Sequence, residues 1–215
     1  MQDKIQSGAD YPIVLSSVKA LRKLHIQELA RVNEYDSTCL FESKLVELLI
    51  TLLAHTDLPE LLLEICWILT NLASCEQGEV EALLAIPDTL TRLNNIVRIP
   101  LPKFTGDVMV DTPLRRSIQL MKAQALQSIG NLAAHKGTAS DGRSVKTLIA
   151  QGGFYVAIAT FLEEHECEAF EECFDAQLMF VLNHLFEETA EISAEAFEPI
   201  ARVFSRNLCR CSESK

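Results

Sequence analysis

Apolar residues recur at intervals of three and four residues along three long stretches of this chain. In the first stretch, "PELLLEICWILTNLASCEQ" (residues 59–77), the pattern is formed by Leu62, Ile65, Leu69 and Leu72. Because an α-helix completes a turn every 3.6 residues, this spacing places the four side chains on one face. The stretch is therefore predicted to be an amphipathic helix with its apolar face in a core.

Two later stretches have the same spacing. Their apolar positions are Ile118, Met121, Ala125 and Ile129 in one, and Phe174, Leu178, Val181 and Leu185 in the other. Shorter apolar segments precede each long stretch, so the chain repeats a layout of short helices followed by a long one. Such self-similarity is typical of helical-repeat proteins, in which each unit stacks on the next.

This layout predicts an all-α fold, an α-solenoid of about three repeats with partial terminal repeats. The expected parts of a single domain (residues 1–215) are an N-terminal capping helix region (1–38), repeats at 39–78, 79–138 and 139–190, and a partial C-terminal repeat (191–215). Residues 98–113 contain three prolines and show no helical periodicity. We therefore expect an inserted loop there.

Several expected helix boundaries carry local signals. Asp57 and Glu60 form an Asp-x-x-Glu pattern, which predicts a capping box at the start of the first long helix. Thr112 before Pro113 predicts the start of the second, because proline favours the first helical position. The glycine pair at 152–153 is expected to end a short helix and to permit a sharp turn.

Each long stretch also contains an asparagine two residues after one of its apolar positions. These asparagines are Asn71, Asn131 and Asn183. Two residues correspond to about 200° around a helix, so each side chain is expected to point away from the core. Asparagine is unfavourable inside helices because its amide competes for backbone hydrogen bonds. An asparagine on the same relative face of three predicted helices suggests that its side chain has a function.

The residue one helical turn before each asparagine shares its face. These residues are Trp67, Gln127 and Met179. Trp67 and Asn71 are thus expected to form one ridge that faces outward. An alternative interpretation is that Trp67 packs against a neighbouring repeat and that the asparagines bond to adjacent helices.

Three stretches of the chain resemble segments of a known protein family. "PELLLEICWILTNLAS" resembles the long third helix of an armadillo repeat, and above all that of importin-α, which carries a Trp-x-x-x-Asn pair. "ALQSIGNLAA" is similar to another such helix, and "VKTLIAQGGFYVAIATFL" resembles the two helices that open a repeat. The resemblance covers roughly residues 15–205 and is strongest at 59–75 and 125–133.

The resemblance implies an armadillo-like solenoid whose third helices line a groove for an extended peptide. In that family, asparagine amides bond to the peptide main chain, tryptophans contact the stems of Lys or Arg, and acidic residues receive their charge. Carried over by position, the peptide-binding residues are Trp67, Asn71, Gln127, Asn131, Met179, Asn183 and Glu187. The chain departs from the pattern at Cys75 and His135, which stand where the family has an acidic residue.

Composition narrows the class of partner. The 215 residues carry a formal net charge of −11, which disfavours nucleic acid and anionic membranes and favours a basic protein segment. The start of the chain has no pattern of a secretory signal, and no apolar stretch reaches the ~20 residues needed to span a bilayer. Seven cysteines, an odd number, suit reduced thiols in the cytoplasm or nucleus.

Motifs for catalysis are missing from the sequence, since it contains no phosphate-binding glycine loop, nucleophile elbow or His-Glu-x-x-His. His165, Cys167, Cys173 and His184 do not have the spacing of a zinc site. We therefore expect no enzyme activity, no metal and no cofactor.

The expected function is a non-enzymatic protein-interaction module, an importin-α-like adaptor in nuclear transport. The alternative is a structural subunit of a permanent assembly that uses the same ridge for packing. The expected state is a monomer or a subunit of a hetero-complex.

Overall fold

The computed structural model describes residues 10–30, 38–55, 57–102, 108–135, 138, 142–164, 180–184, 198 and 200–201. This part of the chain is helical and contains no named strand, only an isolated antiparallel bridge between Thr138 and Ser144. The predicted all-α class is confirmed for these residues.

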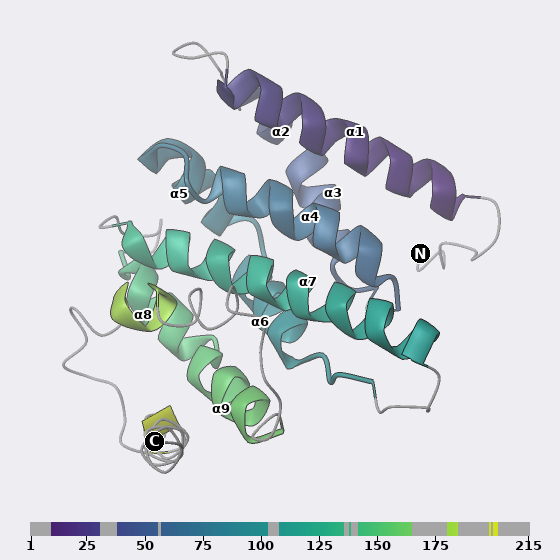
Figure 1. Ribbon diagram of the computed structural model, residues 1–215. Helices are drawn as coiled ribbons and strands as arrows, with labels where there is room; N and C mark the ends of the chain where they lie inside the picture. Colours follow the sequence, from purple (N-terminus) through teal and green to yellow (C-terminus); the bar gives the residue numbers. More distant parts are fainter. Residues whose placement is uncertain are drawn as a thin grey trace.

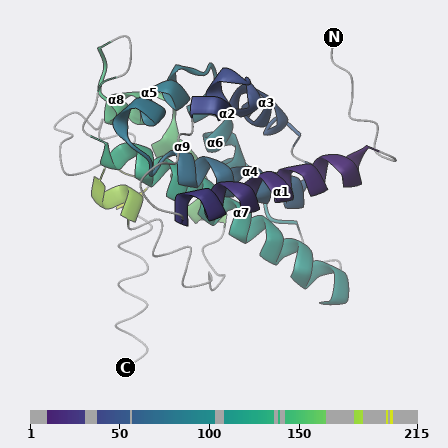
Figure 2. The same cartoon turned by 90° about the horizontal axis from the view of Figure 1, so that it is seen from above.

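Short and long helices alternate along the described part of the chain. They are α1 (Tyr11–Ala30), α2 (Thr38–Glu42), α3 (Leu45–Leu52), α4 (Pro59–Leu72), α5 (Gln77–Ala85), α6 (Thr89–Arg98), α7 (Val108–Ala134), α8 (Val145–Gln151) and α9 (Phe154–Glu164). The long helices α1, α4 and α7 lie side by side as one row (Figure 1). The view from above places α2, α3, α5 and α8 together on one side of this row (Figure 2).

The periodic apolar positions of the long helices are the residues through which these helices pack against one another. The predicted positions on α4 and α7 are buried: Leu62, Ile65, Leu69, Leu72, Ile118, Met121, Ala125 and Ile129. Of the four apolar positions predicted in the third long stretch, only Val181 lies in the described residues, and it is buried as well. Each fully buried Leu or Ile contributes about 1.5–3 kcal/mol relative to an exposed one. The contact of α4 with α7 is the most extensive in the described fold, and α1 packs on the other flank of α4.

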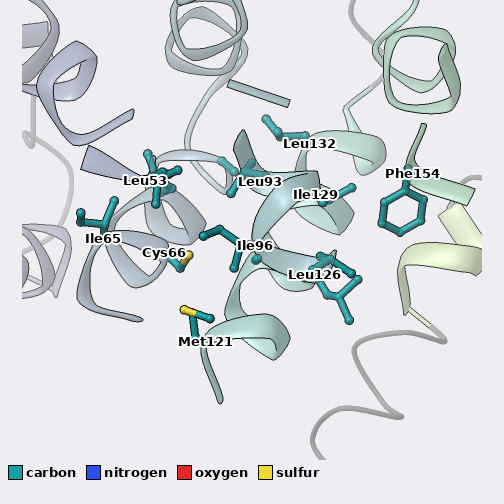
Figure 3. Packing of buried hydrophobic residues seen from close by; sticks show 14 of the residues in the cluster. Leu53, Ile65, Cys66, Leu93, Ile96, Met121, Leu126, Ile129, Leu132 and Phe154 are labelled. Carbon is teal, nitrogen blue, oxygen red and sulfur yellow. The ribbon is translucent and has the colours of Figure 1, made fainter. Parts of the chain in front are cut away.

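The short helices supply the opposite side of the same core. Leu93 and Ile96 of α6 and Phe154 of α9 are fully buried and belong to one continuous cluster with residues of α4 and α7 (Figure 3). A single core therefore runs through both layers of helices.

One backbone conformation recurs along the chain. Lys44 (φ 58°), Asp88 (φ 66°) and Gly153 (φ 79°) have left-handed backbones, and each stands one residue before the second short helix of a group, α3, α6 or α9. This conformation favours glycine and is unfavourable for most other residues. The glycine pair at 152–153 ends α8 and starts the turn to α9, as predicted.

The helical segment 180–184 packs against α7. A Cβ atom on Gly130 of α7 would lie 2.7 Å from two ring carbons of Phe180 and 3.0 Å from a methyl carbon of Val181. The two backbones can approach this closely because Gly130 has no side chain.

The expected loop at residues 98–113 is wrong at both of its ends. Helix α6 ends at Arg98, and α7 already begins at Val108, so that Pro113 lies inside a helix of 27 residues. The missing N–H of Pro113 removes one backbone hydrogen bond, to the carbonyl of the second residue of α7. The predicted helix start at Thr112 is therefore wrong as well.

The capping box at Asp57 is also not formed. The N-cap residue of α4 is Leu58, no side chain caps this end, and Pro59 is the first helical residue. Asp57 lies one residue too far upstream for its carboxylate to reach the first free N–H groups. Proline at the first helical position lacks one of those donors.

Candidate functional site

The candidate site lies on the flank of α4 that faces away from the core. Glu60, Glu64, Trp67 and Asn71 are spaced by 4, 3 and 4 residues, which places them along one face of the helix. Trp67 is 38% exposed, whereas the neighbouring Ile68 and Cys66 are fully buried. Trp67 and Asn71 thus share a ridge off the core, as the sequence pattern predicted.

A guanidinium group from α1 lies on the Trp67 ring. The Cζ atom of Arg22 is 5.5 Å from the ring centroid, within the range of a cation–π contact. Arg22 Nε also donates a hydrogen bond to Glu64 Oε2 over 2.5 Å. One cation is therefore held between an aromatic face and a carboxylate.

A second ion pair joins the same two helices. Lys19 Nζ lies 2.5 Å from Glu60 Oε1, and this hydrogen bond raises the pKa of Lys19. Both carboxylates on the outer flank of α4 are thus paired with cations of α1. Sequence reasoning missed all four charged residues of these two pairs. The available signal was their spacing, three residues apart on α1 and four apart on α4.

Asn71 lies one turn after Trp67 and is half-buried. Its Nδ2 atom is screened from water and has no hydrogen-bond partner among the described residues. The main-chain carbonyl of Asn71 accepts a hydrogen bond from Cys75 Sγ over 3.2 Å. Burial, together with the nearby carboxylates of Glu79 and Glu76, raises the pKa of Cys75. The expected acidic position is therefore filled by a neutral thiol.

Asn131 occupies the equivalent place on α7 and makes an internal contact. Its Nδ2 atom donates to the main-chain carbonyl of Thr70 on α4 over 3.1 Å. Beside it, Thr70 Oγ1 and Ser128 Oγ are 2.8 Å apart in the buried contact between the two helices. Asn131 thus makes the bond between adjacent helices that the alternative interpretation expects.

The other expected site residues are spread along the row. Gln127 is half-buried on α7, one turn before Asn131, and Asn183 is exposed in segment 180–184. Met179 and Glu187 lie outside the described residues. The structure therefore brings Trp67, Asn71, Gln127 and Asn131 onto adjacent flanks of two packed helices.

Neither a metal-binding cluster nor a membrane-spanning helix is found among the described residues. No group of three or more His, Cys, Asp or Glu residues in the described ranges is arranged to hold a metal ion. Three of the four residues of the rejected zinc set, His165, Cys167 and Cys173, lie outside those ranges. None of the helices in the described part of the chain has the length and apolar character needed to cross a membrane.

No protein-family model matches the chain, and a search of curated proteins finds no significant match.

Proposed function

We propose that the chain is an armadillo-like α-solenoid with α1, α4 and α7 as successive long helices and with segment 180–184 packed against α7. Three features support this proposal. The long helices lie side by side, a left-handed residue recurs before each second short helix, and Gly130 allows segment 180–184 to pack closely against α7. A repeated turn at equivalent positions is the arrangement expected of stacked helical units.

We further propose that the chain is a non-enzymatic interaction module. It binds an extended, basic segment of a partner protein along the outer flank of the long helices, as an importin-α-like adaptor in nuclear transport would. One observation carries this proposal: Trp67 and Glu64 hold a guanidinium group at the exposed ridge of α4. The net charge of −11 adds long-range attraction for a basic partner.

The proposed roles follow from the chemistry of the side chains. The indole face of Trp67 attracts a cation by about 0.5–2 kcal/mol, depending on how far water is excluded. The exposed carboxamide of Asn183 offers a donor and an acceptor to a peptide main chain, whereas Asn71 contributes as an acceptor through Oδ1, since its Nδ2 atom is screened from water. Asn131 contributes its Oδ1 acceptor and one remaining N–H, since the other N–H of Nδ2 is bonded to Thr70.

The test is titration calorimetry with a lysine-rich peptide at low and at moderate salt. We expect micromolar binding that salt weakens, and an affinity loss of about tenfold or more in Trp67→Ala. Asn71→Ala is expected to lose affinity as well. The matched control is Leu48→Ala, which truncates an exposed apolar side chain on α3, outside the row.

The proposal fails if the folded wild-type chain binds no such peptide at either salt concentration. It also fails if Trp67→Ala binds as tightly as Leu48→Ala, because the indole would then have no part in recognition.

The second candidate function is a structural subunit of a permanent assembly. The observation that favours it is the exposure of Ile13 (65%) and Leu24 (57%) on α1, the first helix of the row. Exposed apolar side chains on one helix suit burial against another chain. This function predicts self-association of the isolated chain that Ile13→Ser with Leu24→Ser relieves, measured by light scattering. A stable monomer would count against it.

A further inference from the structure

The cation position at Trp67 is already filled by the chain itself. Arg22 of α1 lies over the indole and donates to Glu64, and no other cation is found on that ring among the described residues. We infer that Arg22 is an internal ligand of this position, which a Lys or Arg side chain of the partner must displace. This inference rests on the proposed function and specifies how that site is controlled.

The charges at this position favour one cation at a time. The Glu64 side chain is only 12% exposed and that of Arg22 is 23% exposed, so their contact is largely shielded from water. A second cation beside the pair would be repelled by the guanidinium, whose positive charge already balances the charge of the Glu64 carboxylate. Cations from the partner therefore compete with Arg22 and do not add to it.

The neighbouring ion pair provides a matched control. Lys19 lies three residues before Arg22 on the same helix and pairs with Glu60 of the same partner helix. No contact between Lys19 and the indole is found in the described structure. Removing Lys19 thus removes an ion pair between the same two helices, although a more exposed one, and leaves the Trp67 ring covered.

Trp67 is the only tryptophan of the chain, so its fluorescence reports on this position alone. The experiment measures quenching by acrylamide, a neutral quencher, and titrates a lysine-rich peptide into wild type, Arg22→Gln and Lys19→Gln. We expect Arg22→Gln to raise the quenching constant and to tighten peptide binding about three- to tenfold. Lys19→Gln is expected to leave quenching and peptide affinity within about twofold of wild type.

A conservative variant guards against a change in the fold. Arg22→Lys keeps the charge and a donor for Glu64 but loses the planar group that stacks on the ring. We expect its quenching and affinity to fall between those of wild type and Arg22→Gln, with an unchanged helical circular dichroism spectrum.

The possible failures are distinct. Unchanged quenching in Arg22→Gln would show that Arg22 does not cover the ring and would overturn the inference. Weaker peptide binding in Arg22→Gln would make Arg22 part of the binding surface, which also overturns the inference but leaves the proposed function standing. Absence of binding in every folded variant would overturn both.

Discussion

Asn131 on α7 donates a hydrogen bond to the main-chain carbonyl of Thr70 on α4 over 3.1 Å, although 61 residues separate them in sequence. The bond lies beside the buried contact of Thr70 Oγ1 with Ser128 Oγ. Both hydroxyls also reach main-chain carbonyls, those of Cys66 and Gln124 respectively. Polar groups thus link the two helices within their most extensive contact.

We expect Asn131→Ala to lower the free energy of unfolding by about 1–2 kcal/mol, because the Thr70 carbonyl loses its side-chain donor. Urea unfolding followed by circular dichroism measures this change. The control is Gln127→Ala, one turn earlier on α7, with no hydrogen bond to α4 among the described residues. Equal stability of the two variants would mean that the bond contributes nothing to the contact.

Gly130→Ala is expected to destabilise the fold by about 1–3 kcal/mol, because the added methyl group would overlap the Phe180 ring at 2.7 Å. In an open helical position the same change stabilises by roughly 0.5–1 kcal/mol. Gly78 in α5 has nothing within 4 Å of such a methyl group and is the matched control. Thermal unfolding should therefore shift in opposite directions for Gly130→Ala and Gly78→Ala.

A double variant tests the cause of the first effect. In a Phe180→Ala background, the ring that meets the new methyl group is gone, and Gly130→Ala should destabilise less than in the wild type. An undiminished effect would assign the cost to the contact with Val181 or to the helix itself.

The residues with left-handed backbones before α3, α6 and α9 predict how substitutions there change the free energy of unfolding. Lys44→Gly should raise the free energy of unfolding by up to about 1 kcal/mol, since glycine adopts a positive φ without strain. Asp88→Gly should gain less, because aspartate tolerates this conformation better than lysine. Gly153→Ala should destabilise, both from its φ of 79° and from a contact of 3.1 Å with Arg98. Chemical denaturation measures all three.

Burial raises the pKa of the Cys66 thiol to about 12, from an ordinary value of 9.0. The folded chain therefore keeps a proton that the unfolded chain releases above pH 9, and the associated stability is complete below pH 9 and falls as the pH rises toward 12. Cys66→Ala should flatten this part of the pH profile. A profile in the variant as steep as that of the wild type would contradict the prediction.

The burial of Cys66 also predicts that a thiol reagent labels the cysteines of the folded chain selectively. At pH 8 the exposed Cys39 should react with an alkylating reagent while the native Cys66 does not, as peptide mass spectrometry can follow residue by residue. Rapid labelling of Cys66 in the native state would show that the contact between α4 and α7 opens.

The sequence by itself determined the long helices α4 and α7 and their buried faces. Periodic spacing is a property of neighbouring residues on one helix, so Leu62, Ile65 and Leu69 could be assigned to the core before any packing was known. The same argument placed Trp67 and Asn71 off the core. The local signals for a helix start at Asp57 and Pro113 were misleading, because α4 has Leu58 as its N-cap residue and α7 begins five residues before Pro113.

Only the tertiary structure decided which side chains meet between helices. Arg22 and Glu64 are 42 residues apart, and their contact depends on the register between α1 and α4. The bond from Asn131 to Thr70 depends in the same way on how α7 lies against α4. Helix register is set by the interlocking of many apolar side chains across an interface, which the spacing along one helix does not encode.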